Sequence, residues 1–241
     1  TALMMMAAMT MTSCSGSKKI YGGSNVGESS DMGKNEEDLD NSYLVLSEKQ
    51  HDVINKNNEF ALRLFDKISG QSSQVVSPMS VAYLMGMLAN GADGNTQQEI
   101  LKAIGCEGVS VDDLNETYKA ILSTAGKLDK QTKVEIANFI AVNKNFSVKE
   151  NFSKKVGDSY QAEIESLDFT SGKTTKHING WCKEKTQGMI PQIIDRVDPQ
   201  AVSYLMNAIF FNGTWQSKFD ARNTKEENFR GYTRNIQKVQ M

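Results

Sequence analysis

Apolar residues recur at the spacing of an α-helix in several segments of the chain. In the segment over residues 48–68, one helical face carries Phe60, Leu64, Phe65 and Ile68. This pattern predicts a helix there, and Gly70 follows as a stop signal. The same spacing predicts a helix over residues 111–125, with Leu114 and Tyr118 turned inward.

A further helix is predicted to begin at Ser77-Pro78. The Ser77 hydroxyl can accept a hydrogen bond from a backbone N–H of the first turn, and proline fits that turn because no N–H is needed there. One face of this helix carries Val81, Leu84, Met85 and Leu88. The remaining positions are also apolar, so the helix is predicted to be buried. We interpret four methionines as core-filling residues: Met79, Met85, Met87 and Met206.

Two pairs of residues have the spacing of a capping box, which marks a helix N-terminus. Thr96 and Glu99 predict the start of a short helix, and Ser147 and Glu150 predict the start of another. A last helix is predicted over residues 173–187. Its inward residues are expected to be Ile178, Trp181 and Cys182.

Three longer segments are predicted to be strands: residues 134–142, 162–169 and 201–211. Both faces of residues 134–142 are largely apolar, which is typical of a strand inside a covered sheet, and residues 201–211 are the most apolar of the three. Val75 and Val76 predict a short strand as well. Helices come first and long strands then alternate with helices, so the predicted class is α+β with a large mixed sheet.

The first fourteen residues differ from the rest of the chain. Residues 1–14 are apolar, rich in methionine and uncharged, which is typical of a signal peptide and too short for a membrane span. Small residues before Cys14 are similar to a bacterial lipobox, which predicts a lipidated Cys14. The alternative is an ordinary secretory signal with an incidental cysteine. Either signal predicts a secreted or cell-envelope protein, extracellular or periplasmic.

Residues 15–47 are rich in small and polar residues and are predicted to form a flexible tether. We expect residues 48–241 to form one continuous unit, because no second segment of this composition follows.

The composition excludes several classes of function. The formal net charge of −2 offers no clustered positive charge for a nucleic acid. Three cysteines without a CxxC pair, and two histidines without ligand spacing, predict neither a metal site nor a cofactor. No nucleophile motif or phosphate-binding loop occurs, so we expect no enzymatic activity of the chain's own.

Four stretches together resemble the serpin family: residues 75–100, 134–152, 177–190 and 207–215. The second reads VEIANFIAVNKNFSVKENF, and the last reads NAIFFNGTW. They occur in the order and at the spacing of the family and extend over nearly all of residues 51–241. The chain is identified as the N-terminal portion of a bacterial-type serpin.

The resemblance implies two groups of site residues. Ser77, Ser80 and Asn207 match the shutter, where the family's sheet A parts. Gly213 and Trp215 match the breach, where strand insertion starts. The plainer interpretation is a helix cap with a satisfied buried amide for the first group, and a glycine turn with a core tryptophan for the second.

The resemblance also implies a function. Family members that inhibit serine or cysteine endopeptidases are cleaved in an exposed reactive loop, which then inserts into sheet A. The expected partner is therefore a target endopeptidase. The chain is expected to end before the reactive loop, so it contains no reactive-site residue. The alternatives are a non-inhibitory binding protein of the same fold and, much less favoured, a hydrolase.

Overall fold

The structure is a computed structural model that describes residues 44–70, 75–127, 132–215, 217–231 and 234–241. The predicted signal segment with Cys14 lies outside these residues, as does the predicted tether up to residue 43. None of the described helices is both long and apolar enough to span a bilayer.

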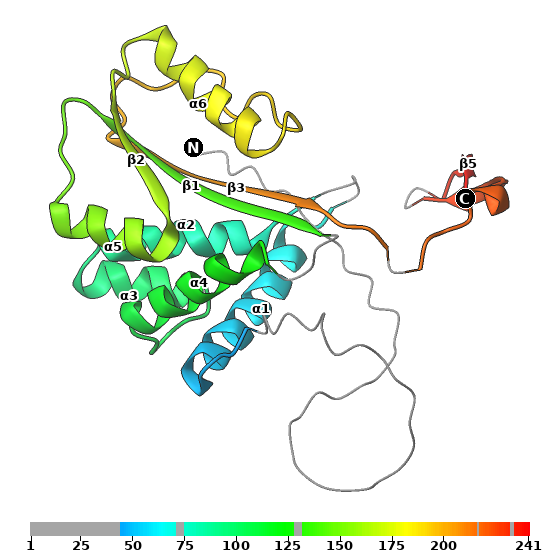
Figure 1. The fold of residues 1–241 in the computed structure, drawn as a ribbon, viewed down its shortest axis with the longest axis horizontal. Coiled ribbons are helices and arrows are strands. Elements are labelled where there is room, and N and C mark those ends of the chain that lie inside the picture. The colour runs from blue at the N-terminus through cyan, green and yellow to red at the C-terminus, as the bar shows by residue number, and fades with distance from the viewer. Residues whose placement is uncertain (1–43, 71–74, 128–131, 216, 232–233) are drawn as a thin grey trace, which may run out of the picture.

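Six α-helices and five strands, with one short 3-10 turn, make up the described chain (Figure 1). The helices are α1 (Glu48–Ile68), α2 (Pro78–Gly91), α3 (Gly94–Ala103), α4 (Val111–Ala125), α5 (Glu150–Tyr160) and α6 (Gly172–Lys185). The strands are β1 (Lys133–Asn143), β2 (Ala162–Leu167), β3 (Ser203–Asn212), β4 (Glu226–Arg230) and β5 (Ile236–Gln240).

The main sheet is three-stranded and mixed, with the order β2-β1-β3. Strand β2 runs parallel to β1 and β3 runs antiparallel to it. The parallel pair is joined through α5, as a crossover between parallel strands requires. Strands β4 and β5 form a separate antiparallel pair.

The two faces of the main sheet are covered by different helices. Figure 1 shows α1 to α5 on one side and α6 alone on the other. Successive side chains of a strand point to opposite faces. Ile140 and Val142 of β1 accordingly pack into the larger cluster with the first five helices. Phe139 and Ala141 pack against α6. Strand β1 thus holds both layers together.

The helices predicted from apolar periodicity are confirmed at residues 48–68 and 111–125. The predicted strands are confirmed as β1, β2 and β3, with ends that differ by a few residues. Helix α6 also buries Ile178, Trp181 and Cys182 as expected. The predicted α+β class with a mixed sheet is therefore correct.

Several local predictions are wrong. Val75 and Val76 are not in a strand, because a strand needs a paired neighbour and none of the described strands lies beside them. Helix α3 begins at Gly94 and is capped by Asp93 instead of Thr96. Helix α5 begins after Lys149 without a side-chain cap, so the Ser147 capping box does not form.

The apolar surface of α2 is also less buried than predicted. Met79 and Leu88 are 43% and 45% exposed, whereas Met87 and Met206 are buried. The buried face instead includes Val81, Tyr83 and Gly86. A helix that is apolar all round does not reveal from its sequence which side faces the core.

Candidate functional site

Ser77 and Ser80 form a hydrogen-bonded pair at the start of α2. The Ser77 Oγ accepts from the Ser80 backbone N–H at 3.2 Å and from the Ser80 hydroxyl at 2.9 Å. Both residues are buried. Pro78 occupies the first turn, as expected. The predicted cap is confirmed, and the second hydroxyl adds a polar contact inside an apolar setting.

Replacing Ser77 with alanine is expected to lower the free energy of unfolding by about 1 kcal/mol, because the first turn of α2 loses its cap. The Ser80 hydroxyl also loses its acceptor. Urea unfolding followed by circular dichroism measures the change. Ser110→Ala is the matched control, because Ser110 also caps a helix, α4, but is exposed. Comparing the two variants separates the loss of a cap from the loss of a buried hydrogen bond. A Ser77→Ala variant as stable as the parent would contradict this prediction.

Asn207 lies in the middle of β3, directly opposite Asn138 of β1. Its Nδ2 donates to Asn138 Oδ1 at 2.9 Å and to the Ala137 carbonyl at 3.3 Å. Asn207 is 4% exposed and Asn138 is 1% exposed. The Oδ1 of Asn207 is buried and has no hydrogen-bond partner among the described residues. The interpretation of Asn207 as a fully satisfied amide is therefore wrong for its oxygen.

Asn138 is a site residue that the sequence interpretation missed. Its Nδ2 donates to the backbone carbonyl of Tyr160 at 2.7 Å. The available signal was one amide inside the apolar run VEIANFIAV, because a buried amide needs partners that an apolar strand does not supply.

The serine pair and the asparagine pair belong to the same layer of the protein. Met206 and Ala208 face α6, so Asn207 between them points to the other face, which α2 covers. Helix α2 packs directly on β3. Within the described chain, each pair is hydrogen-bonded internally and no hydrogen bond joins the two.

Among the described residues, no strand pairs with the outer edge of β3. All ten residues of β3 pair with β1, and β3 is the last strand of the sheet among the described residues. Backbone groups on that side are available to another strand, since an edge strand presents a row of unpaired N–H and C=O groups.

The residues that follow β3 lie at the surface. Trp215 is 63% exposed, and its ring lies 5.9 Å from that of Phe219, which is 83% exposed. The interpretation of Trp215 as a core residue is therefore wrong. At Gly213, an added Cβ would come within 2.7 Å of the Phe211 ring, so glycine allows this ring to fold over the end of the strand.

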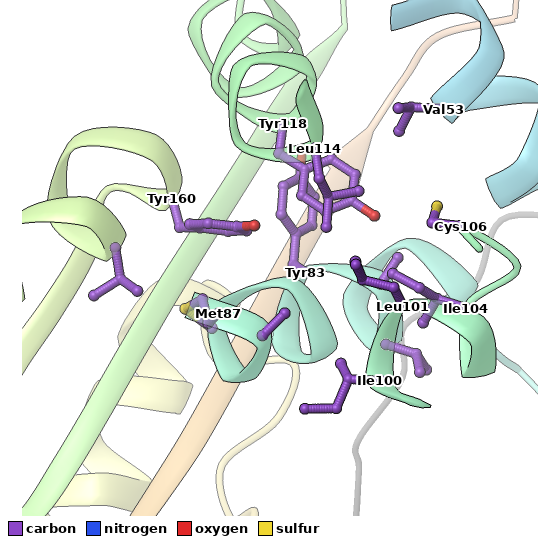
Figure 2. Packing of buried hydrophobic residues seen from close by; sticks show 14 of the residues in the cluster. Val53, Tyr83, Met87, Ile100, Leu101, Ile104, Cys106, Leu114, Tyr118 and Tyr160 are labelled. Carbon is purple, nitrogen blue, oxygen red and sulfur yellow. The ribbon is translucent and has the colours of Figure 1, made fainter. Parts of the chain in front are cut away.

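Burial keeps the two described cysteines and three buried tyrosines in their neutral forms. Burial raises the pKa of Cys106 to about 11 and also raises the pKa of Cys182, which leaves both as neutral thiols. Burial likewise raises the pKa values of Tyr83, Tyr118 and Tyr160. These tyrosines cluster between the helices (Figure 2). The Tyr118 and Tyr160 hydroxyls donate hydrogen bonds to Asn57 and Asn115, whereas the buried Tyr83 hydroxyl has no partner among the described residues.

One histidine of the described chain pairs with an acidic residue at the surface. His177 contacts Glu165 at 2.7 Å on the surface, between α6 and β2. No group of three or more potential metal ligands occurs in the part of the chain that the structure describes. The candidate site consists of the buried polar pairs and the edge of β3 that no described strand covers.

This chain is similar to known proteins in sequence and in fold. Serpin B6 of Bos taurus is 34% identical over 194 residues, which are 77% of this chain and 51% of that protein. Corticosteroid-binding globulin of Pongo abelii is 27% identical over 198 residues, which are 80% and 49%. The crystal structure of the thermophilic serpin tengpin in the native state is 32% identical and has a TM-score of 0.73, covering 81% of this chain and 50% of that one.

This chain thus spans about half the length of the curated relatives that it matches. The family model described as "Serpin (serine protease inhibitor)" matches residues 55–241. With the partial serpin fold and the matches over most of its length, this chain belongs to the serpin family.

Proposed function

We propose that the protein is a serine- or cysteine-type endopeptidase inhibitor that acts by suicide cleavage and insertion of its reactive loop into the main sheet. In this proposal, the chain supplies strands β1 to β3 and one side of the slot that the loop enters. The partner is the target endopeptidase, and the chain performs no catalysis itself.

The observation that carries the proposal is the open edge of β3. An inserted strand would pair with this edge and complete its backbone hydrogen bonds. The unpartnered Asn207 Oδ1, buried in the middle of the same strand, supports the proposal. A buried acceptor without a donor is costly, so a donor from a neighbouring segment would stabilise the sheet. Ladder hydrogen bonds and burial supply the driving force for insertion.

Ser77, Ser80 and Asn207 are proposed to act as the shutter, where the sheet parts. Their short polar contacts lie beneath β3 and can exchange partners as strands separate. Gly213 and Trp215 are proposed to act as the breach. The exposed Trp215 ring follows the end of the open strand, where a loop that enters the slot would first contact the sheet.

The test is incubation of the intact gene product with serine and cysteine endopeptidases. We expect a covalent complex that survives denaturing gel electrophoresis, and we expect no complex with proteases whose nucleophile is replaced by alanine. Cleaved inhibitor is expected to unfold at a higher temperature than the uncleaved form, because the inserted strand adds hydrogen bonds. Cleavage that yields neither a complex nor a gain in unfolding temperature would contradict the proposal.

The second candidate is a non-inhibitory binding protein of the same fold. The similarity to corticosteroid-binding globulin favours it. The same experiment separates the two candidates, since a binding protein would be cleaved as an ordinary substrate. Isothermal titration with a steroid panel would then test small-molecule binding.

We also propose that the protein is secreted or attached to the cell envelope through a lipid on Cys14. The apolar residues 1–14 and the small residues before Cys14 support this location. Mass spectrometry of the mature N-terminus decides it, because a lipidated cysteine carries the added mass of its acyl chains. An unmodified Cys14 in the mature protein would contradict lipidation.

A further inference from the structure

The hydrogen bonds of Asn138 fix the direction of the Asn207 amide. The Tyr160 backbone carbonyl can only accept, so Asn138 must turn its Nδ2 toward it. The Asn138 Oδ1 therefore faces β3, where it can only accept. Asn207 must therefore donate through its own Nδ2, which lies 2.9 Å from Asn138 Oδ1. The Asn207 Oδ1 then points away from Asn138 and has no hydrogen-bond partner in the described structure.

Tyr160 connects this pair to the helices. Its backbone carbonyl accepts from Asn138, while its hydroxyl donates to Asn115 Oδ1 of α4 at 2.8 Å. Asn115 and Asn90 of α2 exchange two side-chain hydrogen bonds at 2.8 and 2.9 Å. A continuous chain of hydrogen bonds thus runs from β3 through β1 and the end of α5 to α4 and α2. Figure 2 shows Tyr160 beside Tyr83 and Tyr118 in this layer.

We propose that Asn138 is a positioning residue for the strand insertion proposed above. Because Asn138 donates to the Tyr160 carbonyl, it keeps the Asn207 nitrogen turned toward β1. The Asn207 oxygen can then accept a hydrogen bond from a donor on the strand that pairs with β3. This inference rests on the proposed function for its purpose. The orientation itself depends only on residues of this chain and can be measured without a protease.

Only certain side chains can perform this role. Asparagine donates and accepts at once, whereas leucine, of similar volume, does neither. An ionised aspartate offers two acceptors, so it can bind Asn207 but repels the Tyr160 carbonyl. A protonated aspartic acid donates through its O–H and accepts through its C=O, which restores both contacts.

The experiment follows the Asn207 side-chain amide by NMR in the ¹⁵N-labelled full chain, with its signal assigned through Asn207→Ser. In Asn138→Leu, we expect its protons to exchange with solvent at least tenfold faster than in the parent. In Asn138→Asp, we expect a parent-like Asn207 signal at low pH and a shifted signal at high pH, because the ionised carboxylate still accepts from Asn207 but is no longer held by the Tyr160 carbonyl. Burial should raise the pKa of the introduced carboxyl. Tyr160, the titratable residue in contact with Asn138, stays neutral over this range because burial raises its own pKa.

The matched control is Thr174→Val. Thr174 is buried in α6 on the opposite side of the sheet, and its hydroxyl donates to the Asp168 carbonyl at 2.6 Å. This variant also loses one buried hydrogen bond, but the Asn207 signal should not change. An Asn207 amide unaffected by Asn138→Leu, or affected equally by Thr174→Val, would overturn the inference.

If Asn138→Leu does not fold, the pH titration of Asn138→Asp decides within a single sample. An Asn207 signal that does not change with pH overturns the positioning role. The two proposals can fail separately. A gene product that forms no protease complex refutes the inhibitor function. If the protein does inhibit, an Asn207 signal that stays constant with pH in Asn138→Asp refutes only the role of Asn138.

Discussion

Replacing Phe139 with alanine is expected to lower the free energy of unfolding by about 3–5 kcal/mol, the usual cost of removing a large aromatic side chain from a core. Phe139 is fully buried in β1. Its ring stacks on that of Trp181 of α6, with centroids 5.2 Å apart. The substitution leaves a cavity between the sheet and the single helix that covers this face. Ile178, Cys182 and Met206 pack in the same cluster and hold α6 against the sheet, so the surrounding structure cannot close the cavity without moving the helix.

Urea unfolding followed by circular dichroism measures this loss, and the fluorescence of Trp181 reports on the environment of α6. The control is Phe219→Ala, since Phe219 is 83% exposed and its loss should change stability by no more than about 0.5 kcal/mol. Equal effects of the two substitutions would mean that α6 is not seated on β1 as the structure has it.

Phe139 also illustrates what was predictable from the sequence. Long helices and buried strands have periodic patterns of apolar residues, and the helices at residues 48–68 and 111–125 follow from them. In β1, both faces are apolar because two different helical layers cover it. The pattern therefore predicted a covered strand but not the helix on each face, since that depends on contacts distant in sequence.

Helix starts were predicted less well. Serine, threonine and glutamate at capping-box spacing also occur by chance near other polar residues. At α3, the Asp93 side chain accepts a hydrogen bond from the Gly94 N–H and caps the helix instead of Thr96. At α5, the helix begins at Glu150 itself, so Glu150 cannot occupy the third position of a capping box. Local motifs compete with one another, and tertiary packing decides between them.

The candidate site was only partly predictable. Ser77 is found from local sequence because a cap is a local interaction. Ser80 and Asn207 were selected through the resemblance to serpins. Asn138 and Tyr160 were missed because their contacts join segments that are 22 residues apart or more. Exposure of Trp215 could not be read from its aromatic character, since that character alone favours a core position.

Substitution of a glycine in α2 is expected to have the second large effect on the free energy of unfolding. Gly86 lies beneath the cluster of Tyr118 and Tyr160, and an added Cβ would come within 3.0 Å of the Tyr118 ring and 3.1 Å of the Tyr160 ring, with the Tyr160 hydroxyl oxygen closer still. We expect Gly86→Ala to lower the free energy of unfolding by about 1–3 kcal/mol, as overpacking of a dense core typically does. Helix propensity alone would favour alanine by about 1 kcal/mol, so crowding has to outweigh it.

Gly157→Ala in α5 is the matched control for Gly86→Ala. An added Cβ at Gly157 meets nothing within 4 Å, so the gain in helix propensity is unopposed and stability should rise by up to about 1 kcal/mol. The two substitutions make the same chemical change inside a helix and should have opposite signs in urea unfolding. A Gly86→Ala variant that is also stabilised would show that the tyrosines can move aside. The hydrogen bond from Tyr160 to Asn115 would then not be rigid enough to hold the end of α5, on which the orientation of Asn138 depends.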